Sequence, residues 1–366
     1  MLTIQEVTGY LEQLAPPAYQ ESYDNAGLIV GDPSTVVTKA LLTLDCTEDV
    51  VREAAELGCN LIIAHHPIVF RGLKKLNGKN YVERTVLAAI RQDIALYAIH
   101  TNLDAVKGGV NWKIAEKLGL ENIRILSPKR QLLEKLTVFV PETHSQAVLD
   151  ALFAAGAGQI GEYRNCSFRS AGTGTFTPSD SAQPFIGQAG RAEEVPEHRV
   201  EVIFPAHLEG KVLRALREAH PYEEIAHYLH LLENEHQEVG SGAIAELPEP
   251  MSEAAWLACL KERMGLNVIR HTPFTGKEVR RVAICGGSGS FLLGNALRQG
   301  ADVFVTADFK YHEFFDAEGR LMICDIGHYE SEVFTKELLE EILKKKFPNF
   351  ATLLSKVQTN PVRYYA

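Results

Sequence analysis

The sequence predicts an α/β fold that is interrupted by a smaller α+β module. Helical and strand patterns alternate near both ends of the chain, and a β-α-β-β-α-β order occupies the middle. At 366 residues the chain also exceeds the size at which a single hydrophobic core is usual. We therefore expect a first α/β lobe at residues 1–128, a ferredoxin-like insert at 129–236, and a second α/β lobe at 237–366.

The first segment combines short apolar strands with amphipathic helices. Strand-like runs at 38–45 (TKALLTLD) and 59–64 (CNLIIA) flank the helical pattern DVVREAAELG. The helix VERTVLAAIRQD and the strand IALYAIHTN follow. Parallel strands joined by helices bring their carboxyl ends to one edge of a sheet, where such folds bind ligands. Three histidines fall at these strand ends: His65, His66 and His100.

The middle of the chain and the last segment follow different patterns. Around a stretch rich in Gly, Ser, Thr and Pro (172–190), the middle shows strands and two helices, and Phe176 and Phe185 favour a packed loop over a flexible linker there. From about residue 239 the α/β pattern resumes, with a helix capped by Ser252 and strands at 301–309 and 320–328.

Composition and charge exclude several classes of protein. The formal charge of -10, from 37 basic and 47 acidic residues, provides no electrostatic surface for a polyanion, so nucleic acid is not an expected partner. The N-terminus lacks a secretory signal and no run of about 18 apolar residues occurs, so we expect a cytoplasmic protein outside the membrane. Six cysteines without a CxxC pair predict reduced, buried thiols.

The adjacent histidines His65 and His66 end the apolar run LIIA. Successive side chains of a strand point to opposite faces, so both rings cannot enter one apolar layer. At the end of a strand, both can approach one polar pocket. Alternatively, one ring hydrogen-bonds a loop carbonyl and the other faces solvent. The pair alone leaves both interpretations open.

The same pattern recurs in HTNLDA and GHYESE. Asp104 follows His100 in a loop at the same expected sheet edge, and Glu332 lies four residues after His328, on the same face if a helix begins there. Taken singly, Asp104 could be a turn former and Glu332 a first-turn carboxylate. Together, imidazoles and carboxylates suit Zn, Mn, Fe or Co. We therefore predict two divalent ions per chain, about 3.5 to 4 Å apart, with five ligands: His65, His66, Asp104, His328 and Glu332.

Five blocks together resemble the signature of the Nif-three-like family, the GTP cyclohydrolase I type 2 homologues: DNAGLIVGD (24–32), AHHP (64–67), HTNLD (100–104), ADVFVTADFKYHE (301–313) and DIGHYESE (325–332). The resemblance implies two related α/β lobes, a dinuclear centre at the five ligands above, and a toroidal homohexamer whose sites face an internal cavity. The middle segment, with GTGTF and AHPYEE, resembles the insert of the longer bacterial members and is similar to the trimeric PII and CutA folds.

Weaker signals complete the prediction. CGGSGS (285–290) could cradle a phosphate, although a tight turn between strand and helix explains it better. Asp308, Lys310, Tyr311 and His312 follow another strand and could line the pocket, and Tyr23, Asp24 and Asn25 could bind a ligand or form a turn. His100 is also a candidate for orienting a metal ligand.

The predicted function is that of a metal-dependent hydrolase. A water activated by two ions would attack a nucleotide or another phosphorylated small molecule, and His312 and His100 are the candidate proton donors. The alternative is a non-catalytic metal-binding regulator or scaffold whose PII-like insert senses a small molecule.

Overall fold

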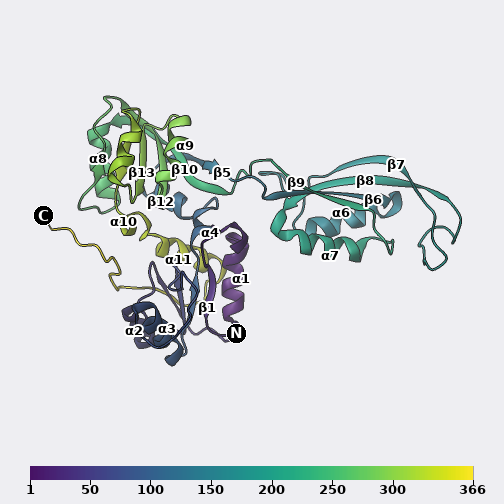
Figure 1. Cartoon of the computed structure of the whole chain (residues 1–366), viewed down its shortest axis with the longest axis horizontal. Coiled ribbons are helices and arrows are strands. Elements are labelled where there is room, and N and C mark those ends of the chain that lie inside the picture. Colours follow the sequence, from purple (N-terminus) through teal and green to yellow (C-terminus); the bar gives the residue numbers. More distant parts are fainter. Residues whose placement is uncertain (366) are drawn as a thin grey trace. The chain divides into compact units, whose positions relative to one another are not determined.

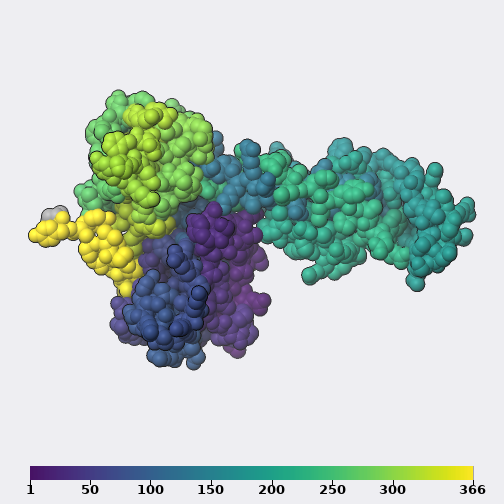
Figure 2. Space-filling model, viewed as in Figure 1, coloured from purple at the N-terminus to yellow at the C-terminus, as the bar shows by residue number. Residues whose placement is uncertain are grey.

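A computed structural model describes residues 1–365, which form two units. Unit 1 combines Met1–Ser127 with the chain from Glu238 onward, and unit 2 is Pro128–Gln237. Figure 2 shows segments from both ends of the sequence, purple and blue together with yellow-green, packed into the body of unit 1. No helix within residues 1–365 is long and apolar enough to cross a membrane.

The first sheet of unit 1 has the strand order β1-β4-β3-β2-β15. Strands β15, β2, β3 and β4 are parallel, and β1 pairs antiparallel with β4. Every residue of β2, β3 and β4 is buried, as expected for parallel strands covered on both faces. The strands are β1 (Gly27–Val30), β2 (Ala40–Thr43), β3 (Leu61–Ala64), β4 (Ala95–Ala98) and β15 (Thr352–Leu354).

Amphipathic helices accompany this sheet, and side chains define their ends. Thr3 caps α1 through a capping box with Glu6, Thr47 and Asn80 cap α2 and α3, and Gly58 in the left-handed region ends α2. The helices are α1 (Ile4–Leu14), η1 (Pro17–Tyr19), α2 (Glu48–Leu57), α3 (Tyr81–Arg91), α4 (Thr101–Asp104), α5 (Val110–Lys117) and α11 (Thr335–Lys346).

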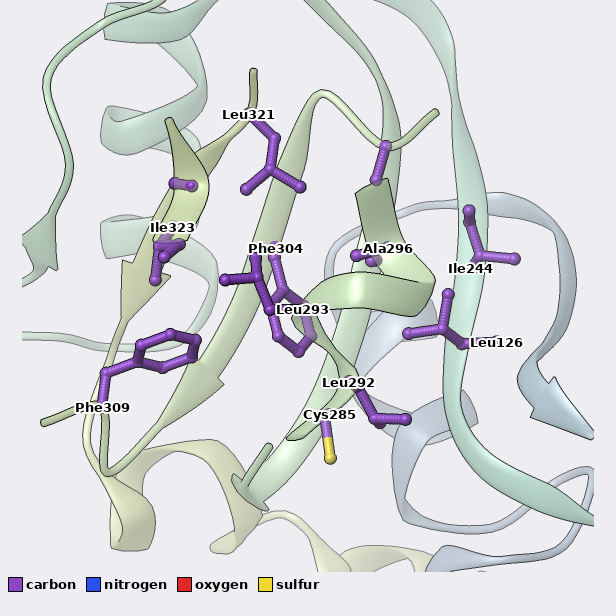
Figure 3. Packing of buried hydrophobic residues seen from close by; sticks show 13 residues of the cluster. Leu126, Ile244, Cys285, Leu292, Leu293, Ala296, Phe304, Phe309, Leu321 and Ile323 are labelled. Carbon is purple, nitrogen blue, oxygen red and sulfur yellow. The ribbon is translucent and has the colours of Figure 1, made fainter. Parts of the chain in front are cut away.

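The second sheet of unit 1 has the order β11-β14-β13-β12-β10-β5. Strands β12, β13 and β14 are parallel, whereas β11 pairs antiparallel with β14 and β10 pairs antiparallel with β12. Figure 3 shows the core between this sheet and α9, where Leu293 and Ala296 lie near Phe304 and Ile244. The elements are β5 (Glu121–Pro128), β10 (Gly240–Ser252), α8 (Glu253–Arg263), β11 (Arg270–His271), β12 (Glu278–Ser288), η4 (Ser290–Leu292), α9 (Leu293–Arg298), β13 (Val303–Ala307), η5 (Tyr311–Ala317), β14 (Met322–Asp325) and α10 (His328–Glu332).

Unit 2 contains an antiparallel sheet with the order β7-β8-β6-β9, and Figure 1 shows α6 and α7 on one face of it. Alternate residues such as Val138 and Val200 pack against Leu152 and Leu216 of the two helices. The elements are β6 (Leu133–Pro141), η2 (Glu142–His144), α6 (Ser145–Ala154), β7 (Phe168–Phe176), β8 (Glu193–Pro205), η3 (Ala206–Leu208), α7 (Glu209–Ala219) and β9 (His227–Leu232).

Three local predictions need correction. The glycine-rich stretch is not a loop throughout, because residues 172–176 form the end of β7 and hydrogen-bond to β8. CGGS is not a turn but the end of strand β12, and a single 3-10 turn follows it. Asp104 is not in a loop, since it closes the helical turn α4 directly after β4.

Candidate metal centre

The carboxyl ends of two strands of the first sheet and one strand of the second sheet bring histidines and carboxylates together. β3 leads into His65 and His66, β4 leads into His100 and Asp104, and β14 leads into α10. Because α10 begins at His328, Glu332 lies one helical turn away on the same face. Three groups have ligand atoms within 4.8 Å of one another and could hold a metal ion: His65, His66 and His100; His66, His328 and Glu332; and His65, Asp104 and Glu332.

His65 is completely buried, and its ring orientation is fixed by the main chain. Its Nδ1 donates a hydrogen bond to the carbonyl oxygen of Ile99 at 2.8 Å. A carbonyl can only accept, so Nδ1 carries the proton and Nε2 carries the lone pair. That Nε2 lies 3.5 Å from Oδ1 of Asp104 and 3.9 Å from Oε1 of Glu332. Burial lowers the pKa of His65 to about 4, so the ring is neutral at neutral pH.

The carboxylate of Glu332 accepts hydrogen bonds from two further imidazoles. Its Oε2 lies 3.0 Å from Nε2 of His66 and 3.1 Å from Nε2 of His328. On the opposite side of each ring, Nδ1 of His66 donates to Asp45 at 2.7 Å and Nδ1 of His328 donates to Asp308 at 2.6 Å. An outer oxygen thus fixes each ring with Nε2 toward Glu332, the arrangement common in metal-ligating histidines.

Proton equilibria at this cluster follow from these contacts. Burial alone would lower the pKa of both rings, but the carboxylates raise the pKa of His66 to about 10 and that of His328 to about 9. Burial would raise the pKa of Glu332, yet hydrogen bonds from His328 and His66 hold it well below its usual range. Two imidazolium charges therefore offset the buried carboxylate where a metal cation would otherwise do so.

His100 completes the ring of imidazoles. Its Nδ1 donates to Oδ1 of Asp24 at 2.7 Å, and the other oxygen of Asp24 accepts from the backbone N–H of Thr101 at 3.0 Å and from its hydroxyl. The ring centroid of His100 lies 5.2 Å from that of His65 and 5.3 Å from that of His66. Asp24 therefore holds His100 as Asp45 holds His66.

Two buried polar atoms of the cluster lack a hydrogen-bond partner among the described residues: Nε2 of His65 and Oδ1 of Asp104. Leaving such atoms unpaired in a protein interior is costly, so native sites normally supply a partner. Burial and the charge of Glu332 also raise the pKa of Asp104 well above its usual value. A divalent cation would satisfy both atoms and offset both carboxylates, and these donors are the types that such cations accept.

Gly287 makes room for Glu332. A Cβ at this position would lie 2.4 Å from Oε1 of Glu332 and 3.2 Å from Cε1 of His328, and the backbone has φ of +63°. Only glycine therefore fits both the conformation and the space. The neighbouring N–H of Gly287 donates to Oγ of Ser331 on α10 at 2.9 Å, which ties the end of β12 to this helix.

A cavity of about 380 Å³ opens onto the cluster. Five residues of the cluster lie on its wall, namely His66, His100, Asp104, His328 and Glu332, and the aromatic side chains Tyr23, Phe70 and Phe291 also line it. Tyr23 and Phe70 lie against each other with ring centroids 6.1 Å apart. The cavity thus combines a polar floor with an aromatic rim, as small-molecule sites commonly do.

Comparison with known proteins shows the family of this chain. The sequence profile of Duf34/NIF3 (NGG1p interacting factor 3) matches residues 2–361. This chain belongs to the Duf34/NIF3 family. Two proteins named GTP cyclohydrolase 1 type 2 homolog are similar to it over 98% of both chains, one from Halalkalibacterium halodurans at 40% identity and one from Bacillus subtilis at 38%.

Solved structures share the fold of this Duf34/NIF3 chain. A Bacillus cereus protein related to NIF3 has a TM-score of 0.86 at 38% identity, covering 100% of this chain and 99% of that one. A Staphylococcus aureus protein has a TM-score of 0.79 at 31% identity, with the same coverage. The mixed α/β architecture with several sheets is thus common to these proteins.

The remaining predicted site residues of this Duf34/NIF3 chain take other places. His312 lies in η5 with its ring against Tyr311 and Phe315, and it is not among the residues that line the cavity at the cluster. Its catalytic role stays a prediction. Asp308 contacts His328, and Asp24 contacts His100.

Sequence analysis missed Asp45, the backbone carbonyl of Ile99 and the role of Gly287. Asp45 could have been found, because it follows β2 at the edge where His65 and His66 follow β3. The carbonyl of Ile99 carries no signal in the sequence, because every residue has one. Gly287 was noted only as part of a turn, because its steric role depends on the side chain of Glu332, 45 positions away in the sequence.

Proposed function

We propose that this chain binds two divalent metal ions, Zn, Mn, Fe or Co, through His65, His66, Asp104, His328 and Glu332, and that it hydrolyses a nucleotide or another phosphorylated small molecule. The carboxylate of Glu332 carries the proposal. One oxygen lies nearest to His65 and the other is shared by His66 and His328. A carboxylate between two groups of ligands is the arrangement that bridges two ions.

Divalent ions bound here would lower the pKa of a coordinated water and polarise a phosphoryl or carbonyl oxygen. The chain itself would supply position and proton transfer. His100 lines the cavity and its Nδ1–H donates to Asp24, so Nε2 of His100 is the nitrogen that can take a proton from the attacking water and then give it to a leaving group. Tyr23, Phe70 and Phe291 would hold a planar base at the rim and keep water out.

The names of the relatives point to GTP as one substrate to test. Both the Halalkalibacterium halodurans and the Bacillus subtilis proteins are named GTP cyclohydrolase 1 type 2 homolog. For this chain we propose the broader class of nucleotides and phosphoesters, because no side chain among the described residues of the cavity wall selects guanine. We further propose a cytoplasmic protein that assembles into a toroidal homohexamer.

We also propose two finer features of the fold. The parallel trios β2-β3-β4 and β12-β13-β14 support two related α/β lobes in unit 1. The β-α-β-β-α-β order and the strand order β7-β8-β6-β9 support a ferredoxin-like insert, similar to PII and CutA, in unit 2.

Metal content per chain, measured by plasma mass spectrometry on protein purified without tag or chelator, tests the proposed site. The wild type should hold about two ions, and Glu332→Gln should hold close to none because both ions share that carboxylate. His65→Ala should keep about one. Glu330→Gln on the same helix is the matched control and should bind as the wild type does.

Activity is tested with GTP and a panel of phosphoesters in the presence of each metal. His100→Asn should lower kcat by about 100-fold with little change in metal content. Protein that neither carries metal nor takes up added Zn, Mn, Fe or Co would contradict the proposed function. So would a metal-loaded protein whose turnover does not depend on His100 or Glu332.

A further inference from the structure

Unit 2 contains a cavity of about 570 Å³ that the proposed hydrolase does not use. All of its lining residues lie between Phe139 and Tyr228, so it is formed within unit 2 alone. Phe139 and Tyr228 lie on the sheet face opposite to α6 and α7, because their neighbours Val138, Val140 and Leu229 pack into the helical core. The loop at 177–190 forms another part of the wall. A volume of this size is typical of small-molecule sites.

Aromatic rings from three separate segments form the walls. Phe139 and Tyr228 meet edge to face with centroids 5.8 Å apart. Tyr222 contacts Phe176 at 5.9 Å and Phe185 at 6.4 Å. Tyr228 and Phe185 are more than half exposed, so this surface offers aromatic faces to whatever enters.

A buried carboxylate lies among these rings. Glu197 is only 6% exposed, and one of its oxygens accepts a hydrogen bond from the hydroxyl of Tyr222 at 2.9 Å. Gly174 on the adjacent strand makes room for it, since a Cβ there would lie 2.2 Å from Oε2 of Glu197. Gly174, the second glycine of GTGTF, therefore needs to lack a side chain so that Glu197 fits beside it.

The motif HPYEE holds Tyr222 in place. Nδ1 of His220 accepts from the backbone N–H of Tyr222 at 3.1 Å, so its Nε2 carries the proton and donates to the carbonyl oxygen of Phe139 at 2.9 Å. One histidine thus joins the tyrosine to strand β6. The ring of His220 also contacts that of Tyr222, with centroids 5.1 Å apart.

All charged residues that line the cavity are acidic. Glu197, Glu223 and Glu224 line it, whereas none of its lining residues is Lys, Arg or His. Glu223 in addition accepts a hydrogen bond from the backbone N–H of Gln183 at 2.9 Å, which joins the loop to the wall. Carboxylates combined with aromatic faces favour a cation, because the faces of aromatic rings are electron-rich.

We propose that this cavity binds a small organic cation, an amine or quaternary ammonium compound that carries an apolar or aromatic group. Its charge would lie beside Glu197, and its apolar group would contact Phe176, Phe185 and Tyr222. A buried carboxylate gains most from a partner of opposite charge, and the rings gain from a desolvated cation. This proposal does not depend on the metal centre of unit 1.

Isothermal titration calorimetry of the full chain with benzyltrimethylammonium chloride tests the proposal, with benzyl alcohol and benzoate as neutral and anionic probes. We expect the cation to bind, and benzyl alcohol and benzoate to bind about tenfold more weakly or not at all. Glu197→Gln should weaken binding of the cation by about fivefold to tenfold. Phe185→Ala, at an exposed loop position that the fold tolerates, should weaken it by a similar factor.

Glu201→Gln is the matched control. It lies on the same strand and the same sheet face, but it pairs with Lys135 and Arg199 and does not line the cavity. Its affinity for the cation should equal that of the wild type. Benzoate binding as tightly as the cation, absence of cation binding, or equal loss in Glu201→Gln and Glu197→Gln would each overturn the proposal. If Glu197→Gln does not fold, unchanged binding by Phe185→Ala would do so.

Discussion

His65 donates from Nδ1 to the carbonyl oxygen of Ile99 over 2.8 Å, in the fully buried end of strand β3. This one bond decides which nitrogen of the ring faces the cluster. Because the acceptor is main chain, substitution of Ile99 cannot remove it, and the tautomer of His65 is fixed by the fold rather than by a neighbouring side chain.

Metal removal should destabilise unit 1. A ligand that binds only the folded state stabilises it by about 2.7 kcal/mol at one hundred times its Kd, so added metal should raise the Tm of unit 1 by roughly 5 to 10 °C and chelator should reverse this. Fluorescence of Trp112 and Trp256 reports on unit 1, since both tryptophans lie there. The Tm of Glu332→Gln should not respond to metal, and an equal response in that variant would contradict the site.

Asp45→Asn should weaken metal binding without abolishing it. Asp45 touches Nδ1 of His66 and would not itself contact the ion, and loss of such orienting partners typically lowers metal affinity about 10-fold to 100-fold. Competition against a chelating dye measures the change. Asp32→Asn, at an exposed turn, is the control and should leave affinity unchanged. An Asp45→Asn protein with wild-type affinity would show that His66 needs no orienting carboxylate.

Gly287→Ala should remove metal binding and destabilise the protein. The added methyl group would overlap Oε1 of Glu332 and force a left-handed conformation on alanine. Gly276→Ala separates the two effects, because Gly276 has φ of +77° but no atom within 4 Å of its Cβ. We expect both variants to lose about 1 kcal/mol from backbone strain, and only Gly287→Ala to lose metal. Metal retained in Gly287→Ala would mean that Glu332 can move aside.

Acid should destabilise unit 2 partly through His220. Burial lowers the pKa of His220 below its usual 6.5, so the unfolded chain binds the proton more readily. The stability contributed by neutral His220 is therefore present above pH 6.5 and is lost as the pH falls below it. His144 of η2 and His227 of β9 face the ring and add to this effect when protonated, while Tyr222 links it to Glu197.

Calorimetry of the full chain across this pH range checks the prediction. The Tm of the transition that responds to His220→Gln should fall by about 2 to 4 °C more in the wild type than in the variant as the pH drops. His230→Gln, at an exposed position of β9, should follow the wild type. If the Tm of the wild type and that of His220→Gln fall equally as the pH drops, His220 does not cause the acid destabilisation.

Much of the candidate site could be predicted because each ligand follows an apolar strand. The alternation of strands and helices indicated that His65 and Asp104 follow strands of one sheet, and the recurrence of histidine and carboxylate after a later strand brought His328 into the same hypothesis. What escaped prediction depends on three-dimensional contacts. Asp45 binds Nδ1 of His66, and Asp308 binds Nδ1 of His328. An aspartate after a strand is common in sequences, so neither residue stands out until its partner is known.

The fold was predictable to a similar degree. The glycines of GTGTF read as a loop, because glycine usually weakens a strand, yet β7 continues through them since one glycine leaves space for Glu197. His312 also follows a strand, but it lies in η5 with its ring against Tyr311 and Phe315, and its catalytic role stays a prediction.

His66 and Glu332, which touch in the cluster, are 266 positions apart in sequence. During synthesis the N-terminal histidines therefore leave the ribosome long before the carboxylate that joins them, whereas the contacts of unit 2 close within Pro128–Gln237. Unit 2 can therefore fold on the nascent chain before α10, which carries His328 and Glu332, has been synthesised. If the cluster binds metal as proposed, its full set of ligands would be available only at the end of synthesis.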